Sequence, residues 1–90
     1  MATEKAIMMT QEEALKWVAA MFEQPVDQLT PETPRDDIPM WDSLGVLMLM
    51  ADYDEKFGIV LTGDDMRGMR KVDDILEVLR KAGKLQKAVA

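Results

Sequence analysis

All four prolines of the 90-residue chain lie in one short stretch, and this stretch constrains the fold more than any other feature. They are Pro25, Pro31, Pro34 and Pro39. Proline lacks a backbone N–H and clashes with the preceding helical turn, so a continuous helix or a central strand is excluded there. We therefore expect a long irregular connection over residues 23–41, held in place by apolar Val26, Leu29 and Ile38. Connections of this length in small domains are usually functional.

Helical periodicity is present on both sides of this connection. Thr10 and Glu13 have the spacing of a capping box, and apolar residues follow at three- and four-residue steps, which predicts a helix over residues 11–22. A second helix is predicted between Asp42, as its N-cap, and Gly58, as its C-terminal stop. The apolar face of this second helix consists of Val46, Leu49, Met50, Tyr53 and Phe57.

Two more helical segments are predicted toward the C-terminus. A short segment begins at Thr62, and Met66 and Met69 are its apolar contacts. The last helix ends before Gly83 and buries Val72, Ile75, Leu76 and Leu79. Arg70 and Lys71 stand where a serine or threonine would cap this helix, and we expect that absence to cost about 1 kcal/mol.

These segments predict an all-α fold, a small four-helix bundle with three longer helices and a short third one. A long loop joins the first two helices. Residues 59–61 could form a brief strand, but no other segment offers it a partner. Ninety residues suit one domain over residues 1–90, with loose ends at 1–9 and 84–90.

Composition excludes several classes of function. The net charge of −6 and pI near 4.5 disfavour nucleic acids and anionic membranes and favour basic surfaces on other proteins. The chain contains no cysteine and no histidine, which excludes disulfides, metal sites built on those residues and a Ser-His-Asp relay. No signal peptide or membrane span is recognisable. We expect a cytoplasmic, monomeric protein that binds no metal.

Ser43, at the start of the second helix, has two interpretations. It could serve only as a helix-start residue. Alternatively, it could bear a phosphodiester, because free N–H groups and the positive end of the helix dipole favour a phosphate there. As an unaided nucleophile it would be poor, since no neighbouring side chain can accept its proton.

A second apolar face of the same helix is not needed for the predicted core. It consists of Leu44, Leu47, Met48 and Ala51. This face could widen the core, or it could be an exposed patch that binds a partner. The acidic residues Asp54 and Glu55 continue it along the helix.

Asp42-Ser43-Leu44, at the head of an apolar helix after a long loop, resembles the phosphopantetheine attachment motif of acyl carrier proteins. The resemblance extends to Phe57-Gly58-Ile59, to Thr62-Gly63-Asp64-Asp65 and to Val72-Asp73-Asp74-Ile75-Leu76. It covers roughly residues 10–83. The three-residue motif alone is weak, but its position in a short acidic chain makes it specific.

The resemblance implies a non-catalytic carrier with 4'-phosphopantetheine, donated by coenzyme A, esterified to Ser43. It implies that acyl intermediates are held as thioesters and presented to enzymes of lipid, fatty acid, polyketide or related biosynthesis. The implied partners are a phosphopantetheinyl transferase and acyl-loading, synthase or transferase enzymes. Asp42 and Leu44 correspond to residues that flank the attachment serine. The implied recognition face consists of Trp41, Leu44, Leu47, Met48, Ala51, Asp54 and Glu55.

The chain departs from the family pattern in three places. Trp41 replaces a common glycine, so an indole is expected near the root of the prosthetic arm. Met48 replaces an acid, and Arg67, Arg70 and Lys71 occupy a region that is often acidic. These departures favour a specialised member of the family over a housekeeping one.

Other hypotheses stay open at this point. An Asp-Ser-Leu string also occurs in a family of serine hydrolases, but those enzymes need a histidine and a larger fold. Calcium binding at Asp36-Asp37 or Asp64-Asp65 lacks the spacing of an EF-hand loop. An aminoacyl or peptidyl carrier, and an unmodified helical interaction module, are the main alternatives. Flexible Met50, Met66 and Met69 could let the bundle shelter an apolar cargo.

Overall fold

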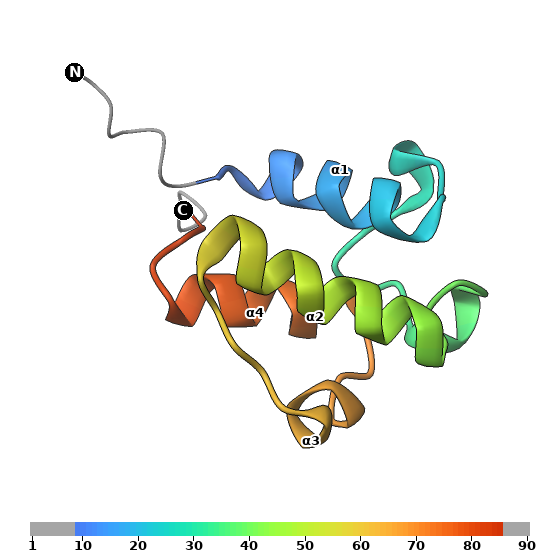
Figure 1. Cartoon of the computed structure of the whole chain (residues 1–90). Coiled ribbons are helices and arrows are strands. Elements are labelled where there is room, and N and C mark those ends of the chain that lie inside the picture. Colours follow the sequence, from blue (N-terminus) through green and yellow to red (C-terminus); the bar gives the residue numbers. More distant parts are fainter. Residues whose placement is uncertain (1–8, 86–90) are drawn as a thin grey trace.

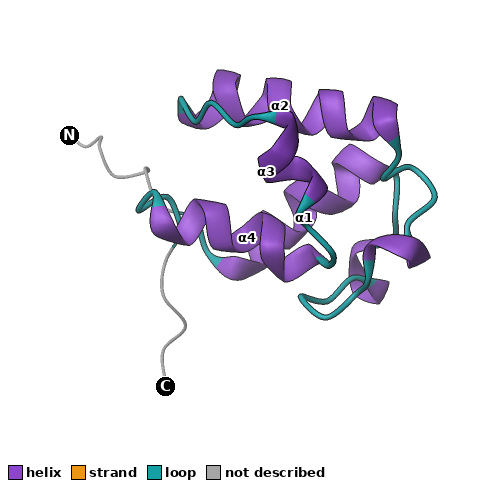
Figure 2. Cartoon of the chain, turned by 90° about the horizontal axis from the view of Figure 1, so that it is seen from below, coloured by secondary structure: helices purple, strands orange, loops and turns teal. Residues whose placement is uncertain are grey.

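The computed structural model describes residues 9–85, and they form four α-helices with two short 3-10 helices in the first loop. The α-helices are α1 (Gln11–Phe22), α2 (Ser43–Phe57), α3 (Gly63–Arg67) and α4 (Val72–Lys81), and the 3-10 helices are η2 (Val26–Gln28) and η3 (Arg35–Asp37). Figures 1 and 2 show the short α3 below the three longer helices, across the space between α2 and α4. No strand occurs in residues 9–85, which confirms the all-α prediction.

Local sequence signals explain where three of the α-helices begin. Thr10 and Glu13 exchange the two hydrogen bonds of the predicted capping box at α1, and Thr62 and Asp65 do the same at α3. At α2 the Asp42 carboxylate accepts a hydrogen bond of 3.0 Å from the Gly45 N–H. These bonds satisfy backbone donors that have no partner within their helix.

The start of α4 is stabilised by the proline-containing loop. The N–H groups of Val72 and Asp73 donate to the carbonyl oxygens of Thr33 and Pro31, at 3.0 and 2.8 Å. The Asp74 carboxylate also accepts from the backbone N–H of Lys71 at 3.2 Å. Lys71 provides no side-chain cap, as predicted, and tertiary contacts instead supply hydrogen bonds to the start of α4.

The core lies where α1, α2 and α4 meet. Each helix buries the face predicted from its periodicity, although Val46, Met50 and Phe57 of α2 are only partly buried. The Tyr53 hydroxyl donates to the Ile75 carbonyl oxygen at 2.7 Å and so joins α2 to α4 inside this core. Burial raises the pKa of Tyr53, since the charged phenolate would lose its hydration.

The ends of the described region correct two sequence-based expectations. The N–H of Met9 donates to the carbonyl oxygen of Lys84 at 2.9 Å, and Leu85 is buried. Residues 9, 84 and 85 therefore belong to the fold and not to loose ends. The remainder of the predicted loose ends lies outside the described residues. In the loop, Leu29 and Ile38 are buried as predicted, whereas Val26 is exposed.

Candidate functional site

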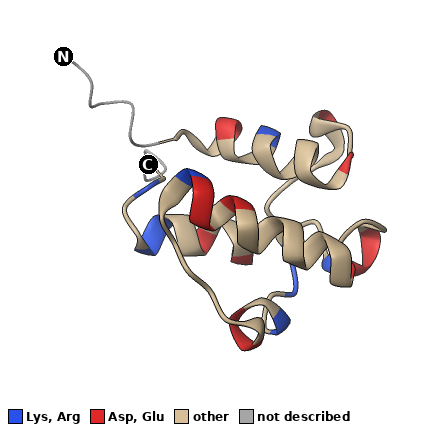
Figure 3. Cartoon of the chain, in the orientation of Figure 1, with Lys and Arg blue, Asp and Glu red and all other residues tan. Residues whose placement is uncertain are grey.

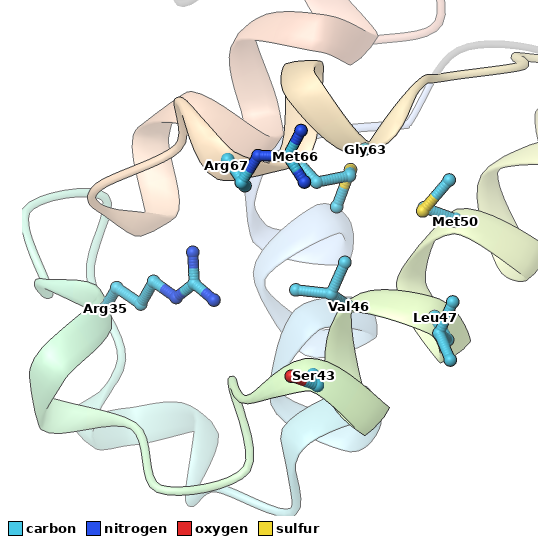
Figure 4. A pocket seen from close by; sticks show the side chains of 8 residues that line it. All are labelled: Arg35, Ser43, Val46, Leu47, Met50, Gly63, Met66 and Arg67. Carbon is cyan, nitrogen blue, oxygen red and sulfur yellow. The ribbon is translucent and has the colours of Figure 1, made fainter.

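Ser43 is the first residue of α2, and its side chain is exposed at one end of a pocket. The pocket has a volume of about 420 Å³ and lies between α2, α3 and the first loop. Its lining is Arg35, Ser43, Val46, Leu47, Met50, Gly63, Met66 and Arg67. Figure 4 shows Val46, Met50 and Met66 directed into this space, with the Arg35 guanidinium reaching toward it from the loop. The serine hydroxyl thus adjoins an apolar hollow with arginines on its far side.

The start of α2 is held closely against the loop that precedes it. Gly45 is buried, and a Cβ atom at this position would lie 1.9 Å from the Met40 carbonyl oxygen and 3.2 Å from Cε1 of Phe22. Only glycine allows this approach of helix and loop backbones. The approach and the Asp42 cap together determine where Ser43 emerges from the bundle.

Trp41 lies inside the core and not on the surface. Its indole is 3% exposed and stacks on Phe22, with ring centroids 5.4 Å apart and planes 15° from parallel. This corrects the prediction that Trp41 belongs to the recognition face. The indole Nε1–H has no hydrogen-bond partner among the described residues.

The other predicted recognition residues share the outer surface of α2. Leu44, Leu47 and Met48 are 63%, 61% and 42% exposed. The alternative in which this face widens the core is therefore wrong. Large exposed apolar side chains gathered beside one another on a small protein often mark a contact surface. We call Leu44, Leu47, Met48 and the exposed Ala51 the α2 apolar patch.

Acidic residues adjoin this patch at the C-terminal half of α2. Asp54 and Glu55, two residues of the implied recognition face, are exposed there. In Figure 3 acidic colour predominates in this half of α2, α3 carries both acidic and basic colour, and basic colour marks the segment that leads to α4. The surface near Ser43 therefore combines apolar and charged regions of both signs.

The structure adds two residues that the sequence analysis did not assign to the site. Arg35 and Arg67 line the pocket together with Ser43. Arg35 is the only basic residue between Lys16 and Lys56, which is the one sequence signal that could have singled it out. Arg67 is mostly exposed and forms an ion pair with Asp64 on α3.

The described residues offer few other kinds of site. Residues 9–85 contain no cluster of three or more acidic side chains arranged to hold a metal ion. None of the helices in that range combines the length and apolar character needed to cross a bilayer.

Comparison with known proteins gives relatives of a single kind. The chain is 28% identical over 76 residues to proteins named meromycolate extension acyl carrier protein from Mycobacterium leprae, Mycobacterium tuberculosis and Mycolicibacterium smegmatis. Each match covers 80% of this chain. It covers 66% of the M. leprae and M. tuberculosis proteins, slightly less than two thirds, and 77% of the M. smegmatis protein.

No protein-family model and no solved structure matches the chain. The four α-helices of the described residues are consistent with the small all-α bundle of an acyl carrier protein. These similarities support assignment of the chain to the acyl carrier protein family.

Proposed function

We propose that this protein carries acyl intermediates on a 4'-phosphopantetheine group esterified to Ser43. The observation that carries the proposal is the placement of Ser43, exposed at the first position of α2, between the apolar pocket and the α2 apolar patch. Ser43 is also the only serine in the chain. The protein itself is not an enzyme in this proposal, and partner enzymes perform the chemistry.

The residues around Ser43 fit such a group. The hydroxyl is accessible, the free N–H groups at the start of α2 favour a phosphate, and the pocket offers an apolar wall beside it. When bound, the group supplies the thiol that this cysteine-free chain lacks, on which acyl units are held as thioesters. Asp42 and Leu44 would flank the attachment point.

We infer a lipid-type acyl cargo, and the relatives' name, which refers to meromycolate extension, supports this inference. The pocket beside Ser43 supports it too, because Val46, Met50 and Met66 provide an apolar lining that could shelter part of an acyl chain. Partner enzymes, first among them a phosphopantetheinyl transferase, would bind the α2 apolar patch and the acids Asp54 and Glu55 through apolar and basic surfaces.

Attachment is tested by incubating the purified chain with coenzyme A and a phosphopantetheinyl transferase of broad specificity, followed by intact mass. We expect one phosphopantetheine adduct on the native chain and on Thr62→Ala, which removes a hydroxyl at the start of another helix. Ser43→Ala should gain no mass. A native chain that remains unmodified with several active transferases would refute the carrier function and favour an unmodified interaction module.

Cargo sheltering is tested by comparing methyl NMR spectra of the thiol form and a medium-chain acyl form. Met50 and Met66 line the pocket, whereas Met69 lies outside it and serves as an internal control. We expect the Met50 and Met66 methyl signals to shift and the Met69 signal to stay in place. Unchanged signals at all three positions would indicate an exposed cargo and favour an aminoacyl or peptidyl carrier.

A further inference from the structure

Arg35 brings a positive charge to the pocket that contains Ser43, and the residues that line this pocket include no acid. Arg67 pairs with Asp64, and Arg80 pairs with Asp73 and Glu77. Two of the four arginines thus form ion pairs, whereas Arg35 and Arg70 form none with a carboxylate in residues 9–85.

The Arg35 side chain is held in one orientation by Trp41. Its Nε–H donates to the Trp41 carbonyl oxygen at 3.2 Å, and its guanidinium carbon lies 5.5 Å from the centroid of the indole ring. Trp41 is itself fixed by burial against Phe22. The guanidinium therefore rests on a rigid support, and the donors on its two terminal nitrogens have no partner among the described residues.

The supported Arg35 guanidinium and the attachment serine line the same pocket. Trp41 is two residues before Ser43, and two peptide units span at most about 7 Å between Cα atoms. Figure 4 shows the Arg35 guanidinium directed from the loop into the pocket, and the Ser43 oxygen on the side of α2 that faces it. A group attached to Ser43 would enter the space between these two side chains.

We propose that Arg35 anchors the phosphodiester at the root of the prosthetic arm. This inference rests on the proposed function, which places a phosphate on Ser43. The planar fork of a guanidinium matches two phosphate oxygens at once, and a fork that is already oriented loses little freedom on binding. Arg35 is then a positioning residue that holds the root of the arm against the pocket and limits how far it swings.

A purely structural role for Arg35, as a cover for the Trp41 ring, is the interpretation to be distinguished. Both roles predict that Arg35→Gln lowers the stability of the unmodified protein. Only the anchor predicts that this variant also loses a stabilisation that arises when the phosphate is attached. Arg70→Gln is the matched control, because Arg70 shares with Arg35 a neighbouring polar pocket but does not line the pocket of Ser43.

The experiment compares native, Arg35→Gln and Arg70→Gln chains before and after loading confirmed by intact mass. We expect loading to raise Tm by about 4 °C more in the native chain and Arg70→Gln than in Arg35→Gln, an increment typical of one added interaction in a domain of this size. The difference should shrink in about 1 M salt, which screens partly exposed charges. The 31P resonance of the loaded chain should shift in Arg35→Gln alone.

The outcomes separate this inference from the function on which it rests. A native chain that loads, with equal Tm increments and equal 31P shifts in all three proteins, overturns the anchor and leaves the carrier function intact. A native chain that never gains the adduct overturns both. If Arg35→Gln does not fold, a measurement on the native protein alone still tests the anchor. The side-chain N–H signals of Arg35 must shift on loading, and unchanged signals refute the anchor.

Discussion

Alanine at Gly45 should destabilise the protein even though alanine is the better helix former. A Cβ atom there would lie 1.9 Å from the Met40 carbonyl oxygen, whereas real Cβ atoms essentially never come closer than 3.0 Å to such a neighbour. Helix α2 and the loop would therefore have to separate by about 1 Å. The loop cannot yield easily, because Trp41 next to Met40 is buried.

The size of the effect follows from two opposing contributions. Overpacking of a tight contact costs about 1–3 kcal/mol, and this contact involves backbone on both sides, which favours the upper end. Replacing glycine by alanine within a helix returns about 1 kcal/mol. We expect Gly45→Ala to lower the free energy of unfolding by about 2 kcal/mol. In a domain of this size Tm should fall by about 10 °C.

Urea unfolding followed by tryptophan fluorescence measures this change, with Gly68→Ala as the control. Gly68 has a φ of −77°, and a Cβ atom there would lie 3.7 Å from the Asp65 carbonyl oxygen, an ordinary contact. Gly68→Ala should therefore leave stability unchanged or raise it by up to about 1 kcal/mol. If Gly45→Ala proves as stable as the native chain, the close approach of α2 and loop is not a constraint on the fold.

Three further predictions concern the cap, the core and the surface. Asp42→Ala should lower the free energy of unfolding in urea by about 1 kcal/mol, since the Gly45 N–H loses its acceptor; an unchanged midpoint would refute the cap. Burial raises the pKa of Tyr53, so just above the ordinary tyrosine pKa of about 10 this side chain ionises only in the unfolded chain. Below that pH, Tyr53 does not change the free energy of unfolding. Above that pH, the free energy of unfolding should fall by up to about 1.4 kcal/mol per pH unit until the pKa of Tyr53 in the folded protein is reached. Urea unfolding at several pH values measures this fall, and Tyr53→Phe should abolish the part of it that is due to Tyr53. Leu47→Asp, at an exposed position, should change the free energy of unfolding by no more than about 0.5 kcal/mol but slow the attachment of phosphopantetheine to Ser43 severalfold. An unaltered attachment rate would show that Leu47 does not contact the transferase.

The helices were predictable because their signals are local. The capping box at Thr10 and Glu13, the periodic face of the first helix and the glycine at position 58 each act within one or two turns, and the structure contains them as predicted. The two apolar faces of α2 were also recognisable. Whether the second face also joins the core depends on where α1 and α4 pack, and periodicity within α2 alone cannot reveal this.

The features that prediction missed share one cause, the path of the loop. Trp41 is buried because the loop returns beneath Phe22, and no local pattern records that return. Lys71 provides no side-chain cap, and the carbonyl oxygens of Pro31 and Thr33 arrive at the start of α4 from more than thirty positions away in sequence. Arg35 becomes part of the Ser43 pocket for the same reason. Long-range contacts of an irregular segment lie outside the reach of propensity and periodicity.

The same loop gives Ser43 a fixed position while leaving α2 accessible. The loop is tied to α4 through its carbonyl oxygens, to the segment after α3 through the Arg35 N–H, which donates to the Arg70 carbonyl oxygen at 2.8 Å, and to α1 through the stacked Trp41. These ties lie on the inner side of the loop, so the outer surface of α2 is not needed to hold Ser43 in place. A partner can therefore bind the α2 apolar patch without disturbing the attachment point. Changes in the loop, by contrast, should displace Ser43 even where the patch is untouched.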